Sequence, residues 1–428
     1  MSYPIVMADV MNAKIEIPVL RESASRLGHS KQAVQEDPIF ELLQAFRRDP
    51  REDKIDLGIG VYRDHANQSP VFEAIKQAEQ WRVDNEPDKA YIGPLGDVEF
   101  GKCIVDLAFG EDLATQLSDR FAFAQTPGGV GALRLAFELL EESLPGATLW
   151  VSDTTWQVHR PIAAAAGLSL NEYCYYNADT GAASFDQLLS SLDGARPGDA
   201  ILLQVSCHNP TGLDLTLEQW QLMAEACIAR QLIPVMDMAY HGLGRGLEAD
   251  RQGLQIMAAS LPEMLLCYTC SKNFGLYRDR TGLVLAMTKN TLEKDAVEKQ
   301  WAQLATRHYF TPPAHGATLV KRILGNAELR QCWESELQAI CDRIGSVRAQ
   351  LFEALSARVP SRDWEFLIRG QGMFALFPLA QTEIQCLRDD YGLYIVNNGR
   401  VNLSGFNQLN VEQAINALTS ALTLSSDG

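Results

Sequence analysis

The sequence has no apolar stretch long enough to span a membrane, and basic residues are outnumbered by acidic ones. Its 428 residues include 37 lysines and arginines against 54 aspartates and glutamates, which gives a formal net charge of -17. Such an acidic chain disfavours nucleic acid and anionic membranes as partners. The N-terminus also lacks a basic start followed by a sustained apolar core. We therefore expect no secretory signal and a cytoplasmic protein.

Metal-binding patterns are also missing. The nine cysteines are an odd number scattered through otherwise regular patterns, which predicts reduced thiols. Cys267 and Cys270 form a C-x-x-C pair, but residues three apart on a strand point to opposite faces and are poorly placed to share a metal. His208 and His241 lack partners at ligand spacing. We expect no metal site.

Two nucleotide-binding patterns, G-x-G-x-x-G and G-K-[ST], are absent as well. The glycine-rich stretch "QTPGGVGAL" at 125–133 does precede a helical pattern. Glycines there leave backbone N–H groups free to bind a phosphate at the start of a helix. Taken alone the signal is weak, because glycine-rich turns between strands and helices are usually structural.

What is present is a long globular chain with an α/β pattern. Strands and helices alternate from about residue 71 for some two hundred residues, which predicts a mostly parallel sheet with helices on both faces. After about 326 the pattern changes to a long helix, short strands and a last helix, typical of a smaller α+β domain. The predicted domains are an N-terminal arm at 1–36, a small domain at 37–69 and 326–428, and a large domain at 70–325. The arm is expected to be partly disordered, or else to clasp a dimer, and Asp37 is expected to cap a first helix.

Polar side chains follow three apolar runs of the large domain. They are Asn209, Asp237 with Tyr240, and Lys272. In sheets of this class, ligands bind beyond the carboxyl ends of the strands. We therefore expect these side chains to share one site.

Lys272 is the most informative of them, because it ends the run "MLLCYTCSK". An ordinary surface lysine is the plain alternative. A lysine desolvated beside other cations instead has a lowered pKa and can attack an aldehyde to form a Schiff base. Asp237 has no evident helix to cap, and a protonated pyridine nitrogen would neutralise it. Arg280 and Arg400 have two interpretations. Each is an ordinary surface arginine, or the two bind a phosphate and a carboxylate, for which guanidinium is the preferred partner.

The motifs together resemble the class I, fold-type I aminotransferases that depend on pyridoxal phosphate (PLP), in the aspartate and aromatic amino-acid branch. The resemblance runs from about residue 37 to the C-terminus. It rests on "DPIFELLQAFRRDPREDKIDLGIGVYRD", "AYIGPLGDVEFGK", "AQTPGGVGALR", "CHNPTGLDLTLEQW", "DMAYHGLGRGLEAD", "SKNFGLYRDRTG", "PPAHGA" and "GRVNLSG".

The resemblance implies a role for each matching residue. Lys272 would bind PLP as a Schiff base and shuttle the proton, with Asp237 and Tyr240 as the other catalytic residues. The further residues that would hold the cofactor are Gly129, Val130, Trp156, His159, Asn209, Thr269, Ser271 and Arg280. In a homodimer, Tyr91 would reach the cofactor phosphate of the other subunit. The residues that would contact the substrate are Gly60, Trp156, Asn209, Thr306, Arg307 and Arg400, of which Arg400 would clamp the α-carboxylate.

Several positions depart from the family pattern. Thr306 stands where the family has an arginine that reads a distal carboxylate, and Arg307 is one step along the chain. Phe310 replaces a small polar residue, Val130 a threonine and Gln204 a histidine. A buried distal carboxylate facing Thr306 and Phe310 would be poorly compensated, so an aromatic or non-standard side chain is favoured over aspartate.

The sequence therefore predicts an amino-acid aminotransferase with ping-pong transfer between an L-amino acid and a 2-oxo acid. A second hypothesis is other PLP chemistry on the same scaffold, namely β- or γ-elimination, replacement or carbon–carbon bond formation. A third is a PLP-binding regulator without catalysis, although no DNA-binding segment is evident and the lysine is retained.

Overall fold

A large mixed sheet forms the centre of the computed structural model, which describes residues 38–177 and 180–424. The predictions for the arm at 1–36 and for the Asp37 cap lie outside the described residues. The strands of this 7-stranded sheet, in the described part of the chain, are β2 (Phe121–Pro127), β3 (Thr148–Ser152), β4 (Ser169–Tyr173), β7 (Ala200–Gln204), β8 (Ile233–Met238), β9 (Met264–Thr269) and β10 (Thr281–Met287).

The strand order is β2-β10-β9-β8-β7-β3-β4. From β9 to β4 neighbouring strands are parallel, and β10 runs antiparallel to both β2 and β9. The predicted fold class, a mostly parallel α/β sheet, is confirmed.

Both faces of the sheet are buried, and the strand sequences reflect this. In β7, Ala200 and Leu202 pack into the apolar cluster on one face, whereas Ile201 and Leu203 pack into the cluster on the other. A strand covered on both sides needs apolar residues at successive positions, which is why these strands are near-continuous apolar runs.

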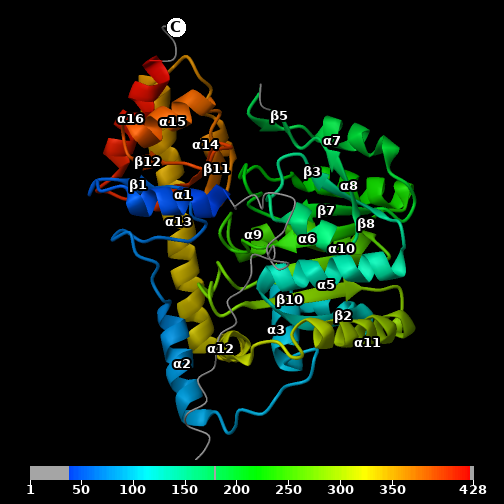
Figure 1. Ribbon diagram of the computed structural model, residues 1–428. Helices are drawn as coiled ribbons and strands as arrows, with labels where there is room; N and C mark the ends of the chain where they lie inside the picture. The colour runs from blue at the N-terminus through cyan, green and yellow to red at the C-terminus, as the bar shows by residue number, and fades with distance from the viewer. Residues whose placement is uncertain (1–37, 178–179, 425–428) are drawn as a thin grey trace, which may run out of the picture. The chain divides into compact units, whose positions relative to one another are not determined.

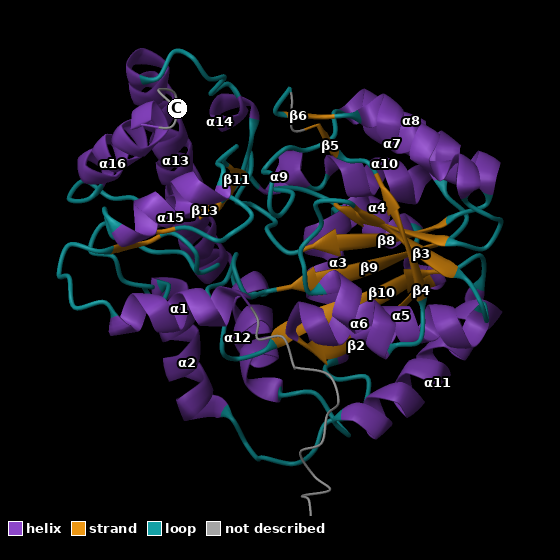
Figure 2. Cartoon of the chain, turned by 45° about the horizontal axis from the view of Figure 1, so that its top comes forward, coloured by secondary structure: helices purple, strands orange, loops and turns teal. Residues whose placement is uncertain are grey.

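Helices form a layer on each face (Figure 2). One face carries α5 (Gly128–Ser143), α6 (His159–Ala165) and α11 (Thr291–His308). The other carries α3 (Val98–Phe109), α8 (Leu217–Arg230) and α10 (Gln252–Ser260). The cluster on that second face also includes residues of α2 (Glu73–Asn85), α4 (Glu111–Gln116), α7 (Phe185–Ser191), α12 (Ala314–Leu324) and α13 (Ala327–Arg358).

A second apolar core lies apart from the sheet and combines residues near the start of the described chain with residues near its end. It joins Ile55 and Leu57 to residues between Val347 and Leu422. Its elements include β1 (Ile55–Asp56), α14 (Phe366–Arg369), β11 (Phe374–Leu376), β12 (Leu393–Tyr394), β13 (Arg400–Asn402) and α16 (Val411–Leu424), with α15 (Gln381–Asp389) packed beside them. Strand β1 pairs in parallel with β12, and β11 pairs antiparallel with β13.

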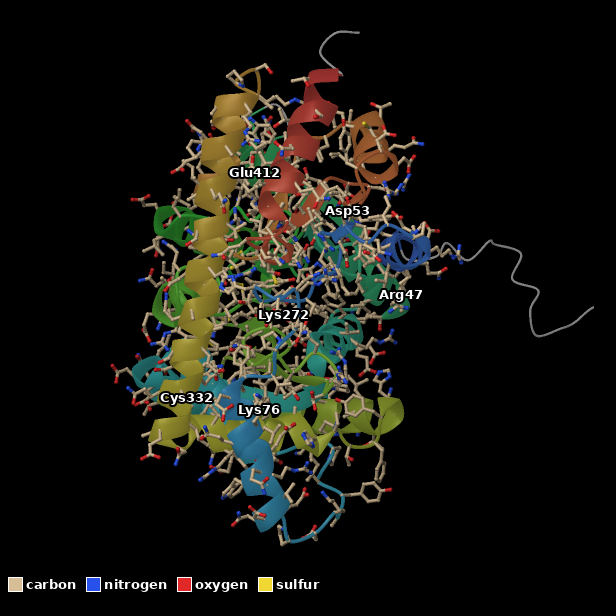
Figure 3. All side chains as sticks on the ribbon, turned by 90° about the vertical axis from the view of Figure 1, so that its left-hand side faces the viewer. Arg47, Asp53, Lys76, Lys272, Cys332 and Glu412 are labelled. Carbon is tan, nitrogen blue, oxygen red and sulfur yellow. The ribbon has the colours of Figure 1, made fainter. Side chains whose placement is uncertain are left out.

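Helix α13 belongs to both cores. Its buried side chains from Leu329 to Ile344 pack with the sheet, and those from Val347 to Leu355 pack in the second core. Figure 1 shows it running from α2 and α12 to α16, and Figure 3 shows Cys332 near one end of it and Glu412 of α16 near the other. The predicted domain boundaries stay a prediction.

The remaining elements are short or peripheral. They are α1 (Pro38–Arg48), α9 (Leu247–Asp250), β5 (Tyr176–Asn177), β6 (Ala182–Ala183) and 3₁₀ helices at Ser118–Arg120, Leu192–Gly194 and Leu403–Gly405. In the described residues, no helix combines the length and apolarity that a membrane crossing requires.

Arg348 of α13 ties the two cores to the loop before β11. Its guanidinium is buried and donates to the carbonyl oxygens of Leu367 at 3.0 Å, Gly372 at 2.9 Å and Phe374 at 2.5 Å. The N–H of Gln371 in the same loop donates to Gly212 at 2.6 Å. The arginine thus satisfies carbonyls that the fold hides from water.

We expect Arg348→Met to lower the free energy of unfolding by about 3 kcal/mol, because several buried carbonyls lose their donor at once. Urea denaturation measures the change. The control is Arg369→Met, since Arg369 is exposed and forms a surface ion pair with Glu365, the residue before α14; its effect should stay below about 0.5 kcal/mol. Equal losses in the two variants would contradict this role of Arg348.

Candidate active site

A cavity of about 210 Å³ opens at the carboxyl ends of β7, β8 and β9. Parallel pairing places Gln204 opposite Asp237, and Asp237 opposite Cys267, so the strand ends meet at one edge. The cavity is lined by Gly129, Val130, Leu133, Trp156, Gln204, Asn209, Asp237, Ala239, Tyr240, Thr269, Ser271, Lys272 and Arg280. The topology thus brings together residues that are far apart in the sequence.

Lys272 lies in this cavity, three residues after β9 ends, and is labelled near the middle of the view in Figure 3. Burial lowers the pKa of its amine to about 8; Asp237 opposes this shift, and the charges of Arg280 and Arg400 add to it. Its Nζ lies 5.2 Å from the centre of the Tyr240 ring. The amine is therefore a usable nucleophile near neutral pH.

A chain of buried polar groups holds Asp237. Its Oδ2 is 3.1 Å from Nε2 of His159, and Nδ1 of that ring is 2.7 Å from the hydroxyl of Thr155. Trp156 packs edge-on against the His159 ring, with 5.2 Å between ring centres. The carboxylate is therefore fixed in place, with a face left toward the cavity.

At the other side of the cavity the residues suit an anion. Helix α5 begins at Gly128, so its first backbone N–H groups lack partners within the helix. The hydroxyls of Thr269 and Ser271 lie 2.9 Å apart, and Arg280 lines the same wall. A Cβ added to Gly128, which has φ +72°, would lie 2.6 Å from a guanidinium nitrogen of Arg280. Glycine is thus needed here for the positive φ and for the close approach of the Arg280 guanidinium to the start of α5.

A third set of residues connects the cavity to the second core. Asn209 donates its amide to the Tyr240 hydroxyl at 3.3 Å and accepts from Arg400 at 3.5 Å. Arg400, on β13, is buried and also donates to the Gly58 carbonyl at 2.6 Å. Burial raises the pKa of the Tyr240 hydroxyl, so it stays protonated at neutral pH.

Phe374 of β11 forms the apolar backing of this region. The Arg400 guanidinium carbon lies 4.5 Å from the centre of its ring, and the Tyr240 ring packs edge-on at 5.8 Å. A Cβ on Gly60 would approach the same ring to 3.3 Å. Gly60 therefore lies close to the arginine end of the site without lining the cavity itself.

Six residues expected in the site do not line the cavity, namely Gly60, Tyr91, His159, Thr306, Arg307 and Arg400. Of these, His159 and Arg400 contact the lining residues Asp237 and Asn209, and Gly60 lies near Phe374. Tyr91 is 84% exposed and packs edge-on against Phe310, which is itself 57% exposed. Thr306 lies near the end of α11 and bonds back to Ala302 within the helix. Arg307 is exposed and pairs with Glu142 at 3.4 Å.

Sequence reasoning missed several residues around the cavity. Leu133 and Ala239 line it, and Thr155 orients the His159 ring. Leu133 stands three positions after Val130 on α5, a spacing that places both on one helix face and could have indicated it. Within the described ranges, no group of three or more His, Cys, Asp or Glu could hold a metal.

The donor set fits PLP. Asp237 suits a pyridinium nitrogen, the α5 start with Arg280 suits a phosphate, and Lys272 suits an aldehyde. The Arg280 guanidinium approaches Gly128 so closely that a Cβ there would clash with it, and this places a cation beside the start of α5, as a phosphate site requires.

Comparisons with known proteins place the chain. It matches the family described as aminotransferase class I and II over residues 52–418. The chain belongs to this family. It is 40% identical to an aspartate aminotransferase of Salmonella typhi, with 91% of this chain and 98% of that protein covered. It is also 40% identical to an aromatic-amino-acid aminotransferase of Pseudomonas aeruginosa, with 89% and 96% covered.

Solved structures of aminotransferases show the same fold. An aromatic-amino-acid aminotransferase from Burkholderia pseudomallei, covalently bound to pyridoxal phosphate, superposes with a TM-score of 0.90 at 33% identity, covering 93% of this chain and all of that chain. The predicted family, the fold class and the assignment as an aminotransferase enzyme are confirmed. The roles of single site residues stay predictions.

The lowered pKa of Lys272 in this aminotransferase can be measured. In the cofactor-free protein we expect the reaction of its amine with a mild acylating reagent to reach half its limiting rate near pH 8, because only the neutral amine reacts. Mass spectrometry of the peptide that contains Lys272 follows the reaction.

Two variants test the direction in which neighbouring charges shift the pKa of Lys272. Asp237→Asn should move the midpoint to lower pH, because the carboxylate favours the charged amine; Arg280→Met should move it to higher pH, because the guanidinium disfavours that charge. A midpoint near that of exposed lysines, or shifts of opposite sign, would contradict the electrostatic account.

Proposed function

We propose that this protein is a PLP-dependent aminotransferase that moves an amino group between an L-amino acid and a 2-oxo acid in two half-reactions, with its specificity directed to aromatic side chains. The observation that carries the proposal is Lys272, an amine of lowered pKa placed in one cavity with the Asp237 carboxylate and the Arg280 guanidinium. The cofactor prediction is confirmed by the family and by its PLP-bound member from Burkholderia pseudomallei.

Bound PLP supplies an electron sink for breaking the Cα–H bond of an amino acid. The chain supplies the rest. Lys272 would hold the aldehyde of the cofactor, and its free amine would accept the proton from the substrate Cα. Asp237, oriented by His159, would pair with the pyridine nitrogen and favour its protonated form. Tyr240 and Asn209 would donate to the ring oxygen, and Trp156 would pack on the ring.

The residues at the α5 end of the cavity would hold the cofactor phosphate. They are the backbone N–H groups of Gly129 and Val130, the hydroxyls of Thr269 and Ser271, and the Arg280 guanidinium. The family threonine at position 130 is valine here, so that hydroxyl is lost and the backbone N–H remains. The hydroxyls of Thr269 and Ser271 and the Arg280 guanidinium remain available to the phosphate.

Arg400 binds the substrate α-carboxylate. It is buried beside Asn209, and its guanidinium packs over Phe374. Buried arginine is suited to bidentate binding of a carboxylate. The Gly60 backbone closes over the same group.

The side-chain preference cannot be decided by identity, because the aspartate and the aromatic relatives are equally similar at 40%. Thr306 supplies no cation where the family has an arginine, and Arg307 is turned to Glu142. A distal carboxylate would therefore lack its ion pair, whereas an aromatic ring needs none. This supports aromatic substrates over aspartate.

We also propose a homodimer with shared sites. Tyr91 and Phe310 are large and exposed and pack edge-on against each other, as suits side chains that a second subunit would cover. Tyr91 would then reach the phosphate in the partner, and Thr306 and Phe310 would face the substrate side chain there. The relatives compared are named as aminotransferases, so the alternative PLP chemistries gain no support.

A single half-reaction tests the activity and the preference. With PLP bound and no 2-oxo acid added, phenylalanine or tyrosine should bleach the visible band and release one equivalent of the matching 2-oxo acid. Aspartate should be slower by about tenfold or more in kcat/KM, since its distal carboxylate is uncompensated. Liquid chromatography measures the 2-oxo acid.

Single-residue variants test which residues provide the activity and the side-chain preference. Lys272→Ala should lose both the visible band and the release, and Thr306→Arg should gain activity on aspartate. Rapid turnover of aspartate that is lost in Arg307→Met would show that Arg307 replaces the missing arginine. Absence of any 2-oxo acid from all amino acids would refute the aminotransferase proposal.

Mixed dimers test the shared site. Tyr91→Phe alone should weaken PLP binding, by about tenfold, because one phosphate hydrogen bond is lost, and Lys272→Ala alone should show no visible band. In a hybrid of the two, one site combines an intact Lys272 with an intact Tyr91 from the other subunit. Half of the sites should then bind PLP as tightly as the unchanged protein. Hybrids with only the weakened affinity would place Tyr91 in its own subunit's site.

A further inference from the structure

Gln204 makes a paired contact that none of the expected roles includes. It is the last residue of β7, it lies opposite Asp237 in the sheet, and it lines the cavity. Its Oε1 accepts the backbone N–H of Asn209 at 2.9 Å, and its Nε2 donates to the backbone carbonyl of Asn209 at 3.1 Å. One side chain thus bonds to both main-chain groups of a residue five positions later.

The loop between these residues is held by other groups as well. Asp214 accepts the backbone N–H groups of Cys207 at 2.9 Å and His208 at 3.0 Å. The Val205 N–H donates to the Asp237 carbonyl at 2.9 Å. These bonds fix the loop up to His208, whereas the Gln204 amide fixes the main chain of Asn209 itself.

The position of Asn209 decides two contacts of the site. Its side-chain amide lies between the Tyr240 hydroxyl at 3.3 Å and the Arg400 guanidinium at 3.5 Å. Both distances are at the long end for hydrogen bonds, so a small rotation of the Asn209 main chain would break them. The residue that sets this main chain therefore controls both contacts.

We propose that Gln204 is a positioning residue of the aminotransferase site, which acts through Asn209 to align Tyr240 with the cofactor ring oxygen and Arg400 with the substrate carboxylate. The inference rests on the proposed function. Gln204 lies between Asp237 and Asn209 at the strand edge, and it carries no charge that could disturb the Asp237 carboxylate. An amide is suited to this place because it offers a donor and an acceptor at once.

The test uses the PLP-bound protein and 3-phenylpropionate, a carboxylate that has no amino group to react. Gln204→Met keeps the length of the side chain and removes both hydrogen bonds. We expect it to raise the dissociation constant of 3-phenylpropionate about tenfold. We also expect a higher pH midpoint of the visible band, because hydrogen bonds to the ionised ring oxygen favour the ionised form.

A double-mutant cycle distinguishes positioning from general stabilisation. If Gln204 acts through Asn209, then in an Asn209→Ala background Gln204→Met should change the dissociation constant less than about twofold. Full additivity of the two changes would overturn the proposal, and so would an unchanged dissociation constant and midpoint in Gln204→Met alone. Gln204→Leu, which also removes both hydrogen bonds without adding a charge, is used in the same cycle if the methionine variant does not fold.

The matched control is Gln255→Met. Gln255 on α10 also donates its amide to a backbone carbonyl, that of Phe109 at 2.7 Å, but it lies outside the cavity lining. Its change should leave ligand binding and the pH midpoint as they were. Equal effects of both glutamine variants would overturn the proposal. A protein that shows no visible band with PLP even before mutation would instead refute the proposed function, so the two failures are distinguishable.

Discussion

The desolvation of one amine, balanced against one carboxylate, is the constraint on which the site depends. An ammonium at the end of β9 loses its hydration, and without Asp237 the loss would drive it to the neutral form still more strongly. The buried carboxylate is stabilised by its contact with His159, whose ring is oriented in turn by the Thr155 hydroxyl. The parallel pairing of β7, β8 and β9 places these groups at one edge, and the cations of Arg280 and Arg400 complete the balance. The sheet therefore supports the chemistry mainly by bringing opposite charges together out of water.

Much of this could be predicted from the sequence. Asn209, Asp237, Tyr240 and Lys272 each follow an apolar run, and a strand buried on both faces has little choice but to be such a run. Helix α11 is harder to predict, because few of its residues are buried and the rest are mostly charged or polar, so its apolar periodicity is weak.

The contacts between side chains were beyond the sequence for a different reason. Thr155 bonds to His159 because of a local turn, and the Gln204 amide meets Asn209 because the chain reverses between them. Neither contact produces a periodicity or a residue spacing in the sequence from which it could be predicted. Likewise, the direction of Arg307 depends on where α11 ends and on Glu142 from α5, which lies 165 positions earlier in the chain. Residue type gives the chemistry of a site, whereas its orientation depends on contacts between distant segments.

The pairing of β1 with β12 has a consequence for how the chain is made. Ile55 aligns with Leu393, and the core around them needs residues up to Leu422. During translation from the N-terminus, the strand at Ile55 and the apolar Leu57 leave the ribosome long before their partners exist. At ordinary rates of synthesis the wait is on the order of tens of seconds. Nascent chains thus carry an unpaired apolar edge through most of their synthesis, which is the stage at which a holdase chaperone has most to protect.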